Sequence, residues 1–529
     1  MDSVRFKSLF IVSPVKYSGV KRMHEIFTEK ELKTLEGNKE LKRFGESRKH
    51  LAADPYRPLY HFSPPENNMN DPNGLCQWRG RYHLFYQFLP ENQKRWHWGH
   101  AVSKDLIHWH DLPVAIRPDR ENDCFSGQTL VEENRVIAIY HGTKLGNMIA
   151  TASDSLLLDW HKHPNNPIIP IVPIDEKGYP YRVFDPCIWR EEDGYYSVSG
   201  TYKDGRLWFD CRGVVHLFHS KDLANWRYLG PLVEGGFYTD PGEDHAVPNF
   251  LPISSTKHML LFFSHKRASQ YYVGVYDRKT HRFHPEFHGR FNYGPIAVGS
   301  LHAPSATIDE KGRFIAIFNV KEGKKREEWN DVMTLPRRLS LAPDNTLRIE
   351  PVEEVTSLRF NHQHIGPLEI PANKEVELPN IHGKAMELKA IFDVRSAREV
   401  GLYVFQSPDG SERTRISFYH NTGVYSPLSA LQIDVSESSL RSDVFARTPE
   451  IAPFTLKDGE PLELRIFIDR SIVEVFANKR QCLTIRVYLQ HKDSDGVSVF
   501  ARGDSAKLVS LDAWQMHAIW PELKDMEGK

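Results

Sequence analysis

The chain has 529 residues, with 68 Lys and Arg against 69 Asp and Glu, which gives a formal net charge of -1. This length exceeds what one hydrophobic core usually serves, so two or more domains are expected. The balanced charge argues against a nucleic-acid-binding protein, and apolar runs such as residues 258–265 are far too short to span a membrane.

The first 54 residues are predicted to form a partly helical extension. From residue 23 the sequence reads "MHEIFTEKELKTLEGNKELKRF", a charged segment with a helical period. The preceding apolar run, Leu9 to Val12, is shorter than the roughly 7 to 15 residues that the core of a secretory signal needs. We therefore expect no signal peptide and favour a cytoplasmic location.

Residues 55–346 contain a repeated element. "SKDLIHW" (103–109) returns as "SKDLANW" (220–226), and "SDSLLLDW" (153–160) is a looser copy. Strand-like runs, each led by a polar turn, are spread along the same region at residues 78–88, 132–142, 191–202, 255–265 and 309–319. This spacing predicts a five-bladed β-propeller, and a large β-sandwich with coincidental repeats is the alternative.

Residues 347–529 differ in texture and are predicted to form a β-sandwich. Within residues 461–490, Leu464, Ile466 and Ile468 occupy alternate positions, and after a polar break at 469–471 the alternation resumes through Val473 and Val475. Such a pattern is typical of an antiparallel hairpin with one buried face. We expect this domain to be structural and the fold class to be all-β.

The cysteines and histidines do not indicate a metal site. The five cysteines, which contain no CxxC pair, predict neither a disulfide framework nor a zinc site and are expected to be buried thiols; they are Cys76, Cys124, Cys187, Cys211 and Cys482. In "HWGH", His97 and His100 are three residues apart and would face opposite sides of a strand. We expect no metal and no organic cofactor.

Several carboxylates lie in Pro- and Gly-rich segments of the predicted propeller. Asp71 is in "NNMNDPNGL" (67–75), Asp185 is in "RVFDPCIW" (182–189), and Glu243 and Asp244 are in "TDPGEDHAVPNF" (239–250). In most proteins such segments form turns. In a propeller, however, the ends of inner strands from different blades converge on one funnel, so residues distant in sequence can act together there.

The chain resembles glycoside hydrolase family 32, which contains invertases, inulinases and levanases that act on β-fructofuranosides. The resemblance rests on motifs spread from residue 61 to residue 478: "HFSPPENNMNDPNGLCQWRGRYHLFYQF", "WHWGHAVSKDLIHW", "CFSG", "VFDPCIW", "HAPSA", "VMTLPRRLSL" and "LRIFIDRSIVEVFAN". It extends over roughly residues 55 to 520 and implies a five-bladed propeller followed by a β-sandwich.

The resemblance also implies roles for individual residues. Retaining hydrolysis in most such enzymes uses an ionised carboxylate nucleophile and a protonated carboxyl. Asp71 is expected to be the nucleophile, Asp185 to stabilise the transition state, and Glu243 to be the acid/base. Residues expected to bind fructose are Asn70, Gln87, Trp98, Phe125 and Ser126. Asn70 and Asn73 are also expected to donate hydrogen bonds that keep Asp71 ionised.

Three motifs depart from the family pattern. The family's first motif usually opens with Trp, whereas here Asn68 precedes Met69. Phe184 stands where the family has an Arg, with Arg182 two residues earlier. Anchoring the third motif on Pro248 puts Ala246 where the family has its Glu, so Glu243 is preferred because Ala cannot donate a proton; Asp244 is the alternative.

The sequence therefore predicts a retaining exo-acting β-fructofuranosidase that releases fructose from sucrose or a fructan. Its expected partner is a carbohydrate substrate, without nucleic acid or membrane. Fructosyl transfer to another sugar is one alternative, and a catalytically silent glycan-binding protein is another. The oligomeric state is not indicated by the sequence.

Overall fold

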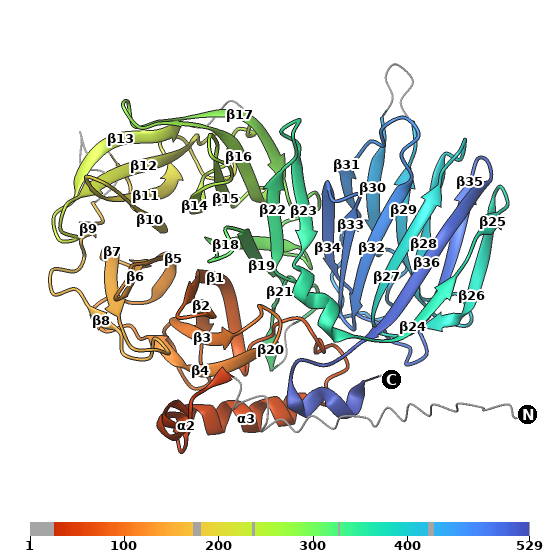
Figure 1. Cartoon of the computed structure of the whole chain (residues 1–529), viewed down its shortest axis with the longest axis horizontal. Coiled ribbons are helices and arrows are strands. Elements are labelled where there is room, and N and C mark those ends of the chain that lie inside the picture. Colours follow the sequence, from red (N-terminus) through yellow and green to blue (C-terminus); the bar gives the residue numbers. More distant parts are fainter. Residues whose placement is uncertain (1–25, 173–180, 235–237, 326–327, 422–427, 528–529) are drawn as a thin grey trace, which may run out of the picture.

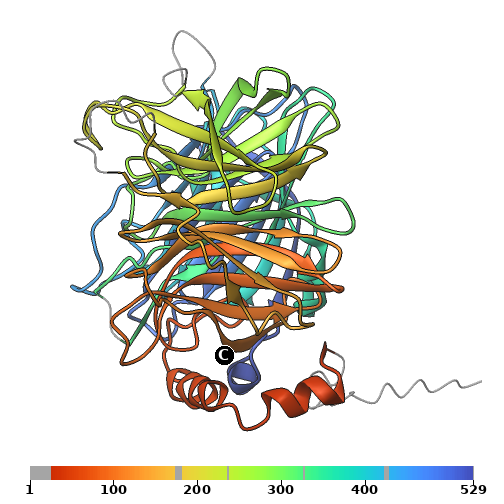
Figure 2. The same ribbon diagram turned by 90° about the vertical axis from the view of Figure 1, so that its left-hand side faces the viewer.

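A computed structural model describes residues 26–172, 181–234, 238–325, 328–421 and 428–527. The expectation that the chain has no signal peptide concerns its first residues, and residues 1–25 lie outside this part. Two β-domains stand side by side in Figure 1, and short helices lie below them in both views (Figures 1 and 2).

The first domain is built from five antiparallel sheets that follow one another along the chain (Figure 1). The first sheet contains β1 (Asn67–Trp78), β2 (Arg81–Leu89), β3 (His97–Ser103) and β4 (Trp109–Ile116). The second contains β5 (Cys124–Val131), β6 (Val136–Gly142), β7 (Gly146–Ala152), β8 (His161–Lys162) and β9 (Ile169–Pro170). The third contains β10 (Pro186–Glu191), β11 (Gly194–Tyr202), β12 (Gly213–Ser220) and β13 (Arg227–Glu234).

The remaining two sheets complete this domain. The fourth contains β14 (Ala246–Pro252), β15 (His258–Ser264), β16 (Ala268–Asp277) and β17 (Arg282–Arg290). The fifth contains β18 (Leu301–Ile308), β19 (Phe314–Val320), β21 (Val332–Met333), β22 (Arg337–Leu341) and β23 (Leu347–Pro351). Because β23 pairs with β22, the last propeller strand lies just beyond the predicted boundary at residue 346.

The first strand of each sheet lies at the centre and forms a closed ring (Figure 1). Contacts run from β1 to β5, from β5 to β10, from β10 to β14, from β14 to β18, and from β18 back to β1. Strand β20 (Trp329–Asn330), which follows β19 in the chain, also pairs in parallel with β1 and joins the end of the domain to its start. This ring of five sheets is a β-propeller, the architecture that the repeats predict.

The "SKDL" repeats form the same turn in two sheets. The carboxylate of Asp105 accepts the backbone N–H of Ile107 at 3.0 Å, and that of Asp222 accepts the N–H of Ala224 at 3.0 Å. The residue that follows each Asp, Leu106 or Leu223, has a φ of 67°. The repeat is therefore a local turn signal at the ends of β3 and β12, which explains why it marks the blades.

The second domain is a sandwich of two sheets (Figure 1). One sheet contains β24 (Arg359–Ile365), β25 (Leu368–Ile370), β27 (Ala385–Asp393), β32 (Leu462–Asp469), β33 (Ile472–Ala477), β34 (Gln481–Arg486) and β36 (Ala506–Met516). The other contains β26 (Lys374–His382), β28 (Glu399–Gln406), β29 (Thr414–Tyr419), β30 (Ala430–Asp434), β31 (Glu450–Pro453) and β35 (Gly496–Arg502). The predicted hairpin is confirmed as β32 and β33, with Asp469 paired to Ile472.

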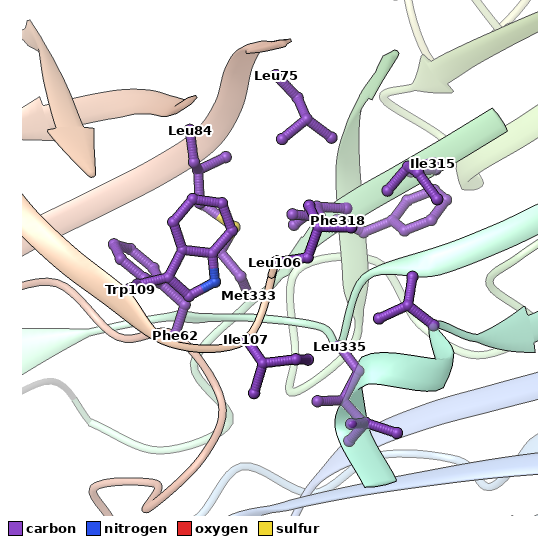
Figure 3. Close-up of a cluster of buried hydrophobic side chains, with 14 of the residues drawn as sticks. Phe62, Leu75, Leu84, Leu106, Ile107, Trp109, Ile315, Phe318, Met333 and Leu335 are labelled. Carbon is purple, nitrogen blue, oxygen red and sulfur yellow. The ribbon is translucent and has the colours of Figure 1, made fainter. Parts of the chain in front are cut away.

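The hydrophobic core is continuous between the two domains. Figure 3 shows Phe62, Leu84, Trp109 and Met333 packed together in the propeller, and the same cluster includes Phe476 of the sandwich. Two 3₁₀ helices, Glu353–Leu358 and Pro521–Met526, flank the sandwich. The two domains therefore fold as one packed unit.

The N-terminal extension is partly helical, as predicted, and is docked on the first sheet. It contains α2 (Glu29–Leu35) and α3 (Lys39–Leu51). Arg48 of α3 is buried, and its guanidinium donates to both carboxylate oxygens of Asp111 in β4, at 2.5 and 2.8 Å. The same guanidinium lies 3.4 Å from the ring centroid of Trp520, so the segment that follows the sandwich also packs on this helix.

Candidate active site

The inner strands bring the predicted residues together at their N-terminal ends. In β1 the pairing with β2 is interrupted between Met69 and Pro72, and similar irregularities occur near the starts of β5, β14 and β18. Such bulges redirect side chains next to active sites. Asp71 lies within the first bulge and Asp185 immediately precedes β10. We call the side chains at these strand starts the axial site.

Asp71 of β1 is held by side chains from β2, β5 and β18. Its Oδ2 accepts the Ser126 hydroxyl at 2.6 Å and the Gln87 amide at 3.4 Å, and its Oδ1 lies 3.3 Å from Nδ1 of His302. Burial raises the pKa of this carboxyl, but the His302 ring, the Lys321 charge and Ser126 outweigh burial and lower it overall. Asp71 is therefore ionised near neutral pH.

The direct donors differ from those predicted. Asn70 and Asn73 were expected to donate to Asp71, but Ser126 and Gln87 do so. The Asn70 amide instead donates to Oε1 of Gln87 at 2.9 Å, which orients the Gln87 amide toward Ser126 and Asp71. Because the bulge turns neighbouring side chains in different directions, proximity in sequence did not identify the contacts.

Asp185 has the opposite electrostatic character. Burial raises its pKa to about 7, and the negative charge of Asp71 acts in the same direction. The positive charge of His265 and the backbone of Val247 lower it only in part. Two neighbouring carboxyls with pKa values shifted in opposite directions are typical of a pair with different catalytic roles.

The two candidate proton donors turn toward different partners. The Glu243 side chain is completely buried and accepts the backbone N–H of Asp240 at 2.8 Å and the Gln270 amide, while Nη2 of Arg290 lies 3.3 Å from its Oε1. Asp244 accepts the backbone N–H of His265 at 2.8 Å and its Nδ1 at 2.7 Å. The role of Glu243 therefore stays a prediction.

The aromatic residues predicted to surround fructose separate into two groups. Phe125 is partly exposed next to Ser126. Trp98 has no exposed surface and packs against Phe85 and Tyr140, with its indole N–H donated to the Phe125 carbonyl at 2.8 Å. The prediction that Trp98 walls the sugar site is thus corrected: Trp98 lies in the core beneath Phe125, where the alternation of strand side chains directs it.

An exposed aromatic ring occupies position 184, where the family pattern has an Arg. Phe184 is 39% exposed and stacks on the ring of His141, with centroids 5.8 Å apart and planes at 6°. Arg182 lies over the ring of Tyr202, 4.7 Å from its centroid. The guanidinium therefore packs on Tyr202, and the residue that precedes Asp185 in the chain presents an exposed aromatic ring.

Three residues of the axial region were missed from the sequence. His302 lies at the bulge of β18, at a strand start that corresponds to that of Asp71 in β1. Lys321 donates to Asn70 and, at 3.0 Å, to Asp331, and its charge acts on Asp71. His265 binds Asp244. Of these three residues, only His302 could have been identified from the sequence, because its motif "HAPSA" resembles the family and precedes a predicted strand.

The part of the chain that the structure describes holds no group of three or more His, Cys, Asp or Glu side chains arranged to bind a metal ion. All five cysteines are buried and unpaired, as predicted. None of the described helices is long and apolar enough to cross a membrane.

A propeller whose inner strands carry two buried carboxylates with oppositely shifted pKa values, beside amide, hydroxyl and aromatic groups, is typical of a glycoside hydrolase. Sequence similarity to known protein families identifies which hydrolase family this is. Residues 61–351 match the Glycosyl hydrolases family 32 N-terminal domain and residues 354–515 match the Glycosyl hydrolases family 32 C terminal. The chain belongs to glycosyl hydrolase family 32.

Relatives and solved structures agree with this assignment. The chain is 28% identical to fructan 6-exohydrolase of Beta vulgaris, over 88% of this chain and 87% of that protein. It is 30% identical to sucrose-6-phosphate hydrolase of Escherichia coli, over 87% and 95%. The crystal structure of fructan 1-exohydrolase IIa from Cichorium intybus superimposes with a TM-score of 0.79 at 26% identity, and the match covers 88% of this chain and 98% of that one.

Proposed function

We propose that this protein is a retaining β-fructofuranosidase that releases fructose from sucrose or a fructan. The observation that carries the proposal is the pair Asp71 and Asp185, buried at the axial site with pKa values lowered and raised respectively. Family membership supports it, and relatives are named as a fructan 6-exohydrolase, a levanase and a sucrose-6-phosphate hydrolase.

In the proposed reaction, Asp71 attacks the anomeric carbon and forms a covalent fructosyl intermediate, which water then hydrolyses. Ser126 and Gln87 hold one oxygen of Asp71, while Oδ1 makes no hydrogen bond to the described residues. Oδ1, which faces only Nδ1 of His302 at 3.3 Å among the described residues, is therefore the oxygen assigned to the attack. Asp185 is proposed to bind sugar hydroxyls and to stabilise the positive charge of the transition state, for which it must be ionised.

The test is fructose release from sucrose, inulin and levan by the wild-type protein. Asp71→Asn is the matched control because it keeps the size of the side chain and the hydrogen bond from Ser126. Release by the wild type alone supports the proposal. Transfer of the fructosyl group at high sucrose would identify the enzyme as a transferase. Sugar binding without turnover of any fructoside would identify a glycan-binding protein and refute the proposal.

A further inference from the structure

We propose that His265, oriented by Asp244, is the group that protonates the leaving oxygen and later activates water, in place of the predicted Glu243. This inference rests on the proposed function and names a catalytic residue for the same site. It follows from the different surroundings of Glu243 and Asp244, which precede β14, and of His265, which follows β15.

His265 is fixed at three points. Its backbone N–H and its Nδ1 both bind the carboxylate of Asp244, at 2.8 and 2.7 Å, and its carbonyl oxygen accepts the indole N–H of Trp208 at 3.0 Å. Its Nε2 makes no hydrogen bond to the residues that the structure describes, and the side chain is 36% exposed. One ring nitrogen is anchored and the other remains available to a substrate.

A line of packed rings joins His265 to the nucleophile. The His265 ring lies 5.0 Å from that of Phe263, between centroids, and the Phe263 ring lies 4.0 Å from that of His302. His302 in turn lies 3.3 Å from Asp71. Burial lowers the pKa of His265, but Asp244, Asp185 and Asp71 outweigh burial and raise it. The protonated ring is therefore favoured near the reacting carboxylates.

Glu243 has surroundings of a different kind. Its side chain has no exposed surface, and its two oxygens are occupied by the Asp240 backbone, by Gln270 in β16 and by Arg290 in β17. A general acid must reach the leaving oxygen. Ala246, the first residue of β14, carries no acid and is also fully buried. Glu243 thus holds the segment before β14 in place, and Asp244 orients the histidine.

The proposed reaction has two steps. Asp71 bonds to the anomeric carbon of the fructosyl unit while the bond from that carbon to the leaving oxygen breaks. The bonding electrons go to the leaving oxygen, which takes the proton from Nε2 of the His265 imidazolium. In the second step neutral Nε2 takes a proton from water, the water oxygen bonds to the anomeric carbon, and Asp71 is released as a carboxylate.

The decisive experiment compares sucrose with a nitrophenyl β-fructofuranoside, whose good leaving group needs little protonation. In His265→Ala, kcat for sucrose should fall by about 10²- to 10⁴-fold, the usual size of general acid catalysis, while the first step on the aryl substrate is largely spared. Azide, which needs no base, should partly restore turnover of the aryl substrate. His265→Gln, which keeps a polar side chain of similar length, serves if the Ala variant unfolds.

Two control variants separate the role of His265 from that of Glu243. His108 binds Asp105 through Nδ1 at 2.8 Å in the turn after β3, so His108→Ala removes a similar His–Asp pair and should leave both activities unchanged. Glu243→Gln should not change the ratio of sucrose to aryl-fructoside activity. A selective loss on sucrose in Glu243→Gln, or equal losses in kcat/KM, which reports the first step, on both substrates in His265→Ala, would overturn the proposal.

Asp244→Asn tests the positioning role. The charges that face His265 are Asp244, Asp185 and Asp71, while Lys266 and Arg267 of its own turn bind the Pro241 carbonyl and Asp240. Since His265 must be protonated, activity falls as pH rises through its pKa. Loss of the Asp244 charge lowers that pKa, so the basic limb of kcat/KM should move to lower pH. An unmoved limb would contradict the role, whereas inactivity of the wild type on all fructosides would refute the proposed function itself.

Discussion

Two sets of buried carboxylates differ in their surroundings, one at the axial site and one at the interface between the two domains. At the interface, Asp469 accepts the backbone N–H groups of Leu59, Tyr60 and His61 at 2.6 to 2.9 Å and the ring Nδ1 of His61 at 2.9 Å. These donors belong to the segment that leads into the propeller. Asp469 therefore ties the sandwich hairpin to the propeller through backbone groups.

Glu474 completes the interface network. It accepts the Leu335 backbone at 2.7 Å, His61 Nε2 at 3.2 Å, Arg337 at 2.6 Å and the Thr484 hydroxyl at 3.1 Å. Burial raises its pKa, but Arg337 and His61 outweigh burial and lower it to about 2. Glu474 is therefore ionised near neutral pH, and both of its oxygens accept hydrogen bonds.

The axial carboxylates Asp71 and Asp185 are also buried, each 7% exposed, but they are incompletely paired. Oδ1 of Asp71 makes no hydrogen bond to the described residues, and the pKa of Asp185 is about 7. A buried carboxylate with all its hydrogen bonds satisfied stabilises the fold, whereas one with an unused oxygen or a raised pKa is available for chemistry. The number and kind of partners distinguish the two regions more than the small difference in burial does.

The largest expected effect is in Asp71→Asn. Removal of the nucleophile should lower kcat for sucrose by at least about 10⁴-fold, because covalent catalysis is lost as a unit. Thermal unfolding should be close to that of the wild type, since the Ser126 hydroxyl can still bind the amide oxygen. Fructose release and the unfolding midpoint together check this. A variant with a tenth of wild-type activity would remove Asp71 from its role.

Asp185→Asn should have the next largest effect on activity. The loss of a charge that opposes the developing positive charge should lower kcat by about 10²- to 10³-fold, with little change in KM. Because its pKa is about 7, the ionised form is already costly in the folded state, so stability at pH 8 should not fall. Steady-state kinetics on sucrose provide the measurement, and an effect confined to KM would contradict the transition-state role.

Glu474→Gln should reverse the pattern. Removing one partner of a buried ion pair leaves the Arg337 charge uncompensated and should lower the free energy of unfolding by about 3 to 5 kcal/mol. The folded fraction should keep its kcat, since Glu474 does not touch the axial site. Denaturant unfolding and kinetics well below the midpoint check both parts. A large fall in kcat with normal stability would undo the distinction between the two regions.

The smallest expected effect is a shift in pH dependence in Phe184→Arg. Activity requires ionised Asp185, so it should be lost as pH falls through the pKa of about 7. A guanidinium at position 184 would favour the ionised form and lower that pKa. The acid limb of kcat/KM should therefore move to lower pH. An unchanged limb would show that the new side chain points away from Asp185.

Much of the fold was predictable because its signals are local. The "SKDL" turns mark blade strands, and period-two alternation defines the β32–β33 hairpin. The end of the propeller was placed a few residues early because β23 shows its membership only through pairing with β22. Strand content is written in short stretches of sequence, whereas strand partnership depends on the whole sheet.

Residues of the site were predictable only where a single sequence motif contains them. Asp71 and Asp185 come from distinctive Asp-Pro segments at inner strand starts. His265 and Lys321 come from a turn and a strand end in other sheets and reach the site by folding alone, so no local pattern indicates them. For Trp98, the sequence could not distinguish a wall of the site from the core beneath it, because one register step decides which face is exposed.

The central claim is that Asp71 forms the covalent bond to the sugar. It is tested most directly by acid quenching during turnover of an aryl β-fructofuranoside, followed by digestion and mass spectrometry. The account predicts one fructosyl unit esterified to the peptide that contains Asp71, and none on peptides that contain Asp469 or Glu474. A fructosyl ester on Asp185, or full turnover with no ester on any carboxylate, would contradict it.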